Sequence, residues 1–163
     1  MEGIKLVAVE VLREELERGT NDIIKDYVRQ GMKASGKFAQ MVRETIEVST
    51  THLIGEILGP DYAEYMKRGR GPGKMPMVER IELWLQQKGI RALNRKITQR
   101  SLAWAIAKNI AKKGTETFQK GGSDFVENVF TAKRIEEVFD RVASALIDEL
   151  VKVYVTEAVV LTR

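Results

Sequence analysis

The 163-residue chain contains no cysteine and a single histidine, His52. The lack of cysteine excludes disulfides and thiolate metal ligands, and it is compatible with a reducing cytoplasm. One histidine without a carboxylate at ligand spacing does not make a metal site, so we expect His52 to be structural or at the surface. No apolar run reaches the roughly 18 residues of a membrane span, and the first residues turn acidic after Val9, unlike a signal peptide. We therefore expect a protein that is made in the cytoplasm and has no membrane partner.

Residue patterns typical of catalysis are also missing. Ser123 follows two glycines, but it has neither the closing glycine nor the preceding apolar strand of a nucleophile elbow. Paired carboxylates such as Glu14 and Glu15 fall on polar helix faces, where a solvated charge is the ordinary interpretation. The sequence therefore predicts no catalytic residue, no cofactor and no metal, and we expect that the protein is not an enzyme.

The glycine-rich segment GRGPGK, residues 69–74, differs from a phosphate-binding loop. Such a loop has four residues between its glycines, continues with Lys-Ser or Lys-Thr, and follows an apolar strand. Here three residues separate Gly69 from Gly73, and Lys74 is followed by Met75. The preceding segment is amphipathic and basic. We therefore do not expect nucleotide binding at this loop.

The charge of the chain is strongly polarised along the sequence, although the formal net charge is only +4. Residues 1–65 hold 8 Lys/Arg and 12 Asp/Glu, residues 66–120 hold 14 and 3, and residues 121–163 hold 5 and 8, giving −4, +11 and −3. A basic middle between acidic flanks suits a polyanionic partner, or subunits that dock acidic faces on basic ones. A soluble pair of basic helices without a partner is the alternative.

The N-terminal third of the chain predicts helices followed by a β-hairpin. Apolar residues at helical spacing predict helical structure over 3–34, in which Gly19 offers a break or a kink. Alternating apolar and polar residues, then a second short apolar run, predict a β-hairpin over 38–58 that turns at residues 49–51. The length and the 44% apolar content are typical of one domain, so we predict a single domain over 1–163.

The rest of the chain predicts amphipathic helices with clear ends. Gly89 is a left-handed cap after the first helix, and Thr98 and Thr131 begin the next two. The tail over 151–161 is rich in β-branched residues, so it either extends the last helix or forms a strand, and we favour the strand. The predicted helices cover 77–88, 98–113 and 131–150. The expected fold class is α+β and helix-rich, with a small antiparallel β-sheet packed with amphipathic α-helices.

The segment from Tyr62 to Gly89, YAEYMKRGRGPGKMPMVERIELWLQQKG, carries a characteristic order of motifs. Tyr-Ala-x-Tyr is followed by Gly-Arg-x-Pro-Gly-Lys-Met-Pro, a helix that contains tryptophan, and Lys-Gly-Ile. This order resembles the tail-completion or head–tail joining proteins of tailed bacteriophages. Ser101 to Phe118 resembles the family's Ala-Ile-Ala-x-x-Ile helix that ends in Gly-Thr. The resemblance covers about half of the chain, and Met77 stands where members often carry a second proline.

The resemblance implies a structural virion protein whose chemistry is assembly. Such a protein sits at the neck or the tail end as a ring of identical subunits and joins the capsid vertex to the tail. The implied partners are other neck or tail proteins, such as a connector or adaptor, the tail tube or its terminator. Non-specific contact with packaged DNA is also implied. The implied location is the virion, assembled in the cytoplasm of the bacterial host.

The basic glycine- and proline-rich loop over 67–75 is the expected contact site. Its composition predicts a mobile loop that orders on contact with a neighbouring subunit or that faces the DNA channel. The alternative function is that of a small protein that binds nucleic acid non-specifically and neutralises phosphates with the basic region 66–120. The candidate loop residues are Arg68, Gly69, Arg70, Gly71, Pro72, Gly73 and Lys74. Secondary basic contacts are expected from Arg91, Arg95, Lys96 and Arg100.

Overall fold

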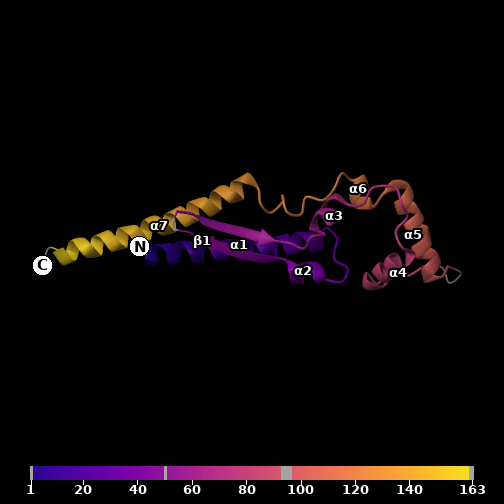
Figure 1. The fold of residues 1–163 in the computed structure, drawn as a ribbon, viewed down its shortest axis with the longest axis horizontal. Coiled ribbons are helices and arrows are strands. Elements are labelled where there is room, and N and C mark those ends of the chain that lie inside the picture. The colour runs from indigo at the N-terminus through magenta and orange to yellow at the C-terminus, as the bar shows by residue number, and fades with distance from the viewer. Residues whose placement is uncertain (1, 50, 93–96, 162–163) are drawn as a thin grey trace. The chain divides into compact units, whose positions relative to one another are not determined.

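The computed structural model describes residues 2–49, 51–92 and 97–161, and it confirms a helix-rich α+β chain (Figure 1). The chain divides into two compact units. We call Met1–Asp26, Val42–Leu58 and Val126–Arg163 the hairpin unit, and Tyr27–Met41 and Gly59–Phe125 the loop unit. The prediction of one domain stays a prediction. The elements are α1 (Glu2–Arg29), α2 (Lys37–Met41), β1 (Arg43–Val48), β2 (Leu53–Leu58), α3 (Ala63–Arg68), α4 (Val78–Gln87), α5 (Gln99–Lys113), α6 (Glu116–Gln119) and α7 (Ala132–Leu161).

In the hairpin unit, β1 and β2 form the predicted antiparallel hairpin. The register runs from Arg43 opposite Leu58 to Val48 opposite Leu53. One face of the hairpin packs on α1 so closely that a Cβ on Gly55 would lie 2.8 Å from Cδ1 of Leu16. Figure 1 shows α7 running along the same unit as α1 and the hairpin. A single apolar face of the hairpin is therefore covered, as the alternating sequence predicts.

Helix α1 is continuous from Glu2 to Arg29, so the predicted interruption at Gly19 does not occur. A Cβ on Gly19 would lie 2.4 Å from Cζ of Phe130. The glycine thus leaves room for a packed ring, and the cost of one glycine inside a long helix is only about 1 kcal/mol. The helix ends near Gly31, whose φ is 71°, and not at residue 34.

The predicted strand start at residue 38 is wrong, because Lys37–Met41 is the short helix α2. The ring of Phe38 lies 4.5 Å from that of Tyr27 and 5.6 Å from that of Phe125, centroid to centroid. All three rings are buried and form the aromatic core of the loop unit. Packing of Phe38 into this cluster overrides the local alternation.

The favoured strand over 151–161 is also wrong, because α7 continues as a helix to Leu161. β-Branched residues lower helix propensity by only a few tenths of a kcal/mol each. A strand requires a neighbour, and in the described part of the chain the sheet has only two strands, β1 and β2. Extension of a helix that is already formed is therefore favoured. No helix in the described ranges is long and apolar enough to cross a membrane.

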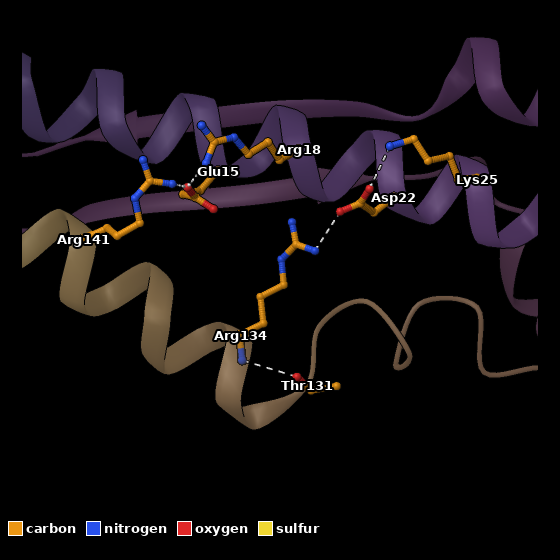
Figure 2. Close-up of polar contacts among 7 residues, drawn as sticks. All are labelled: Glu15, Arg18, Asp22, Lys25, Thr131, Arg134 and Arg141. Carbon is orange, nitrogen blue, oxygen red and sulfur yellow. Dashed lines mark hydrogen bonds and ion pairs between the residues drawn. The ribbon is translucent and has the colours of Figure 1, made fainter.

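The expected caps are present after α4, before α5 and before α7, whereas the predicted end of the last helix at residue 150 is wrong. Gly89 follows α4 with a φ of 67°. The side chain of Thr98 accepts a hydrogen bond from the Ser101 amide at 3.1 Å. Thr131 Oγ1 accepts one from the Arg134 amide at 3.3 Å (Figure 2). Local capping chemistry was sufficient to place these ends.

Candidate interaction site at the glycine-rich loop

The glycine-rich loop joins α3 to α4 and is hydrogen-bonded to the C-terminal end of α5. The Gly73 amide donates to the Ala111 carbonyl at 2.8 Å, and the Thr115 amide donates to the Arg70 carbonyl at 2.8 Å. The Arg70 amide donates to Thr115 Oγ1 at 2.9 Å. The loop therefore follows a hydrogen-bonded path within its own chain, where the sequence predicts a segment that orders on contact.

Two glycines allow this close approach of backbone to backbone. Gly69 has a φ of 73°, and a Cβ there would lie 2.5 Å from the Phe118 amide nitrogen. Gly114 has a φ of 79°, and a Cβ there would lie 2.7 Å from the Arg70 carbonyl oxygen. Only glycine adopts this conformation without strain and leaves the neighbouring chain in place. The two segments that carry the family resemblance, 62–89 and 101–118, are thus in direct contact.

The charged residues of the loop have different environments. Arg68 is the last residue of α3, pairs with Glu64 one turn earlier, and keeps 78% of its side chain exposed. Arg70 Nη2 donates to the Lys74 carbonyl at 2.5 Å and so closes the loop on itself. Pro72 and Lys74 are exposed. Lys74 therefore faces solvent, Arg68 does so as an exposed ion pair with Glu64, and Arg70 braces the loop.

The four predicted secondary contacts do not form one patch. Arg100 pairs with Glu79 at 2.9 Å and with Glu82 at 3.7 Å, so α4 neutralises much of its charge. Hydrogen bonds from its own backbone amide and from Arg100 lower the pKa of Glu79. Arg91 is exposed beside a separate depression of about 440 Å³. Arg95 and Lys96 lie outside the described residues.

A groove of about 560 Å³ opens beside the loop in the same unit. Tyr65 and Trp84 are 78% and 37% exposed on its walls. Its cations are engaged within the chain: Lys88 donates to the Gly31 carbonyl, and Lys120 pairs with Glu116 at 2.6 Å. The hydrogen bond from Lys120 is the main cause that lowers the pKa of Glu116. The groove is thus aromatic and polar, and its cations are hydrogen-bonded within the chain.

Of a basic and aromatic row on α5, the sequence predicted Arg100 as a contact but not Lys108 or Lys112, although the four-residue spacing is readable there. Trp104 is 50% exposed, and Lys108 Nζ lies 5.1 Å from the centroid of its ring, a cation–π contact. Residues four apart lie on one side of a helix. The row consists of Arg100, Trp104, Lys108 and Lys112.

The charged contacts of the hairpin unit hold α7 against α1 (Figure 2). Glu15 is buried and pairs with both Arg18 and Arg141. Asp22 pairs with Arg134 at 2.8 Å, and a hydrogen bond from Arg134 is the main cause that lowers the pKa of Asp22. The two pairings run in opposite directions along the helices, so α7 is antiparallel to α1. These ion pairs link the two helices of the unit.

The two units carry opposite charges. The hairpin unit holds 10 Lys/Arg and 17 Asp/Glu, a net charge of −7. The loop unit holds 17 Lys/Arg and 6 Asp/Glu, a net charge of +11. The three charge blocks of the sequence are therefore distributed over two units of opposite net charge. The basic loop unit is the candidate to bind an acidic partner.

Among residues 2–49, 51–92 and 97–161, no three His, Asp or Glu side chains lie close enough together to hold a metal ion. The chain matches no protein-family model, no curated protein and no solved structure.

Proposed function

We propose that this protein is a structural component of a tailed-phage virion, which forms or joins an oligomeric ring at the head–tail interface or the tail end. The observation that carries the proposal is the contact between the two segments that resemble this family. The loop at residues 69–74 is hydrogen-bonded to the turn at Gly114 and Thr115. The bonded residues Arg70 and Thr115 are 45 positions apart in the sequence. The two segments that resemble the family therefore belong to one folded site and not to two separate ones.

The loop supports this function by presenting charge on a fixed backbone. Arg68 and Lys74 point into solvent while the glycines and Thr115 hold the main chain. A surface that is already ordered loses less conformational entropy on binding than a free loop does. Arg68 and Lys74 dock on the acidic surface of a neighbouring virion protein or on DNA that passes through the ring.

A second candidate function is non-specific binding of nucleic acid. The net charge of +11 on the loop unit favours it, as does the row of Trp104, Lys108 and Lys112. Lysines neutralise phosphates, and an exposed tryptophan can stack on a base. This function predicts micromolar binding of DNA that weakens steeply as salt is raised.

The test of the proposed function is deletion of the gene from the phage that encodes it, followed by negative-stain electron microscopy of the particles. Filled heads and finished tails that lie apart support a role at the joint. Intact, infectious virions overturn the proposal and favour the nucleic-acid function.

A variant of the loop tests the residues themselves. Arg68→Glu with Lys74→Glu should abolish complementation of the deletion, because both side chains are exposed at the proposed contact. The free energy of unfolding should change by no more than about 0.5 kcal/mol for each exposed site. Lys33→Glu with Lys37→Glu changes two exposed lysines of the same unit by the same charge and is the matched control. A normal yield of infectious particles from the loop variant would rule out this contact.

A further inference from the structure

One side of α7 carries apolar residues that the described part of the hairpin unit leaves exposed. Ile135, Phe139 and Ile147 are 44%, 70% and 58% exposed, and with exposed Ala143 they recur every four residues. Glu136 and Asp140 lie next to this row and are exposed. Neither carboxylate forms an ion pair with any residue that the structure describes. We call these residues the α7 face.

The exposed row on α5 is aromatic and basic. Trp104 supplies a half-exposed aromatic ring, and Lys108 and Lys112 continue the row at the same four-residue spacing. Within the described ranges neither Lys108 nor Lys112 has an ion-pair partner, and Lys108 Nζ lies over the face of the Trp104 ring. We call Trp104, Lys108 and Lys112 the α5 face.

The two faces are complementary in charge. Rows of residues four apart form the ridges that interdigitate when two helices pack. The α7 face is an apolar row with two carboxylates beside it, and the α5 face is an aromatic ring followed by two lysines. The charges are opposite, Glu136 and Asp140 against Lys108 and Lys112, and they belong to units with net charges of −7 and +11.

We propose that the α7 face of one copy of this chain docks on the α5 face of the next copy. The alternative pairing of two α7 faces would set Glu136 and Asp140 against their own kind, which is repulsive. A contact between two different faces is head-to-tail, so successive copies close into a ring or continue as a filament. This interface rests on the proposed function, which requires subunits that assemble, and it identifies the two surfaces through which the subunits bind.

The test is an exchange of charge between the two faces of the purified full-length chain. Glu136→Lys with Asp140→Lys reverses one face, and Lys108→Glu with Lys112→Glu reverses the other. Each double variant alone should self-associate roughly 100-fold more weakly than the natural chain in low salt, because like charges then meet. An equimolar mixture should recover the assembly, because each altered face meets its complement on the other variant. Analytical ultracentrifugation at several concentrations measures all three samples.

The controls separate this interface from folding and from DNA binding. Glu10→Lys with Glu17→Lys changes two exposed carboxylates of α1 in the same unit and should leave association unchanged. Circular dichroism should show equal helix content in every variant. A natural chain that stays monomeric, or a mixture that does not reassemble, overturns the interface. The interface is also overturned if reversing the charge of the α5 face abolishes DNA binding and leaves self-association intact. None of these outcomes changes the particle phenotype of the gene deletion, so the two proposals fail independently.

Discussion

The hydroxyl of Thr115 should be a main support of the glycine-rich loop, and Thr115→Ala tests this directly. Thr115 Oγ1 accepts from the Arg70 amide at 2.9 Å and from the Phe118 amide at 3.4 Å, where it caps α6. Loss of an N-cap costs about 1 kcal/mol, and an amide that loses its partner costs about 1 kcal/mol more. We therefore expect the free energy of unfolding of the loop unit to fall by about 2 kcal/mol.

The assay is urea unfolding followed by tryptophan fluorescence. Both tryptophans of the chain, Trp84 and Trp104, lie in the loop unit, so their emission reports that unit. A loss of about 2 kcal/mol should lower the urea midpoint by roughly 1 M. Exchange of the Arg70 amide with solvent should accelerate about 30-fold if it opens with the loop.

The matched control is Thr115→Ser, which keeps the hydroxyl and loses one methyl group. It should stay within about 0.5 kcal/mol of the natural chain, because the methyl is the smaller contribution at a partly exposed position. If Thr115→Ala and Thr115→Ser unfold at the same urea concentration, the hydroxyl does not hold the loop. The loop would then depend on its backbone hydrogen bonds alone.

Two further predictions concern the hairpin unit. A hydrogen bond from Arg134 is the main cause that lowers the pKa of Asp22 from 3.8. The ionised carboxylate of Asp22 therefore stabilises the fold fully above about pH 4, and this stabilisation is lost as the pH falls through the lowered pKa. Arg134→Gln should raise that pKa towards 3.8 in an NMR titration and remove this part of the acid sensitivity, and an unchanged pKa would refute the assignment. Gly55→Val should cost about 1–3 kcal/mol in thermal unfolding, because its side chain would overlap Leu16. Glu56→Val, on the open face of the same strand, should stay within about 0.5 kcal/mol, and equal losses would contradict the packing.

The candidate site was only partly readable from the sequence. The glycine and proline content located the loop, and the order of motifs around it carried the family resemblance. The sequence did not reveal that Thr115 anchors Arg70, because 45 residues separate them and only the fold brings them together. It also ranked Arg100 as a contact, yet Glu79 on α4 compensates that charge. Partners of a charge depend on which helices pack, and packing is not a local property.

The sequence by itself determined the elements whose signals are local. Thr98 and Thr131 mark helix starts because their side chains accept hydrogen bonds from backbone amides three residues later. Gly89 marks a helix end because it adopts a positive φ. The hairpin over β1 and β2 followed from alternation and a polar turn, both of which act at short range. The segregation of charge into an acidic and a basic part was likewise visible before any fold was known.

Only the tertiary structure decided the rest. Phe38 lies in a helix because Tyr27 and Phe125 enclose its ring, and Gly19 stays helical because Phe130 occupies the space that a side chain would need. The two compact units are built from separated segments of the chain, so no linker composition marks their boundary. Long-range packing is worth several kcal/mol per buried aromatic side chain, whereas local propensities differ by tenths of a kcal/mol. Where the two conflict, packing determines the conformation.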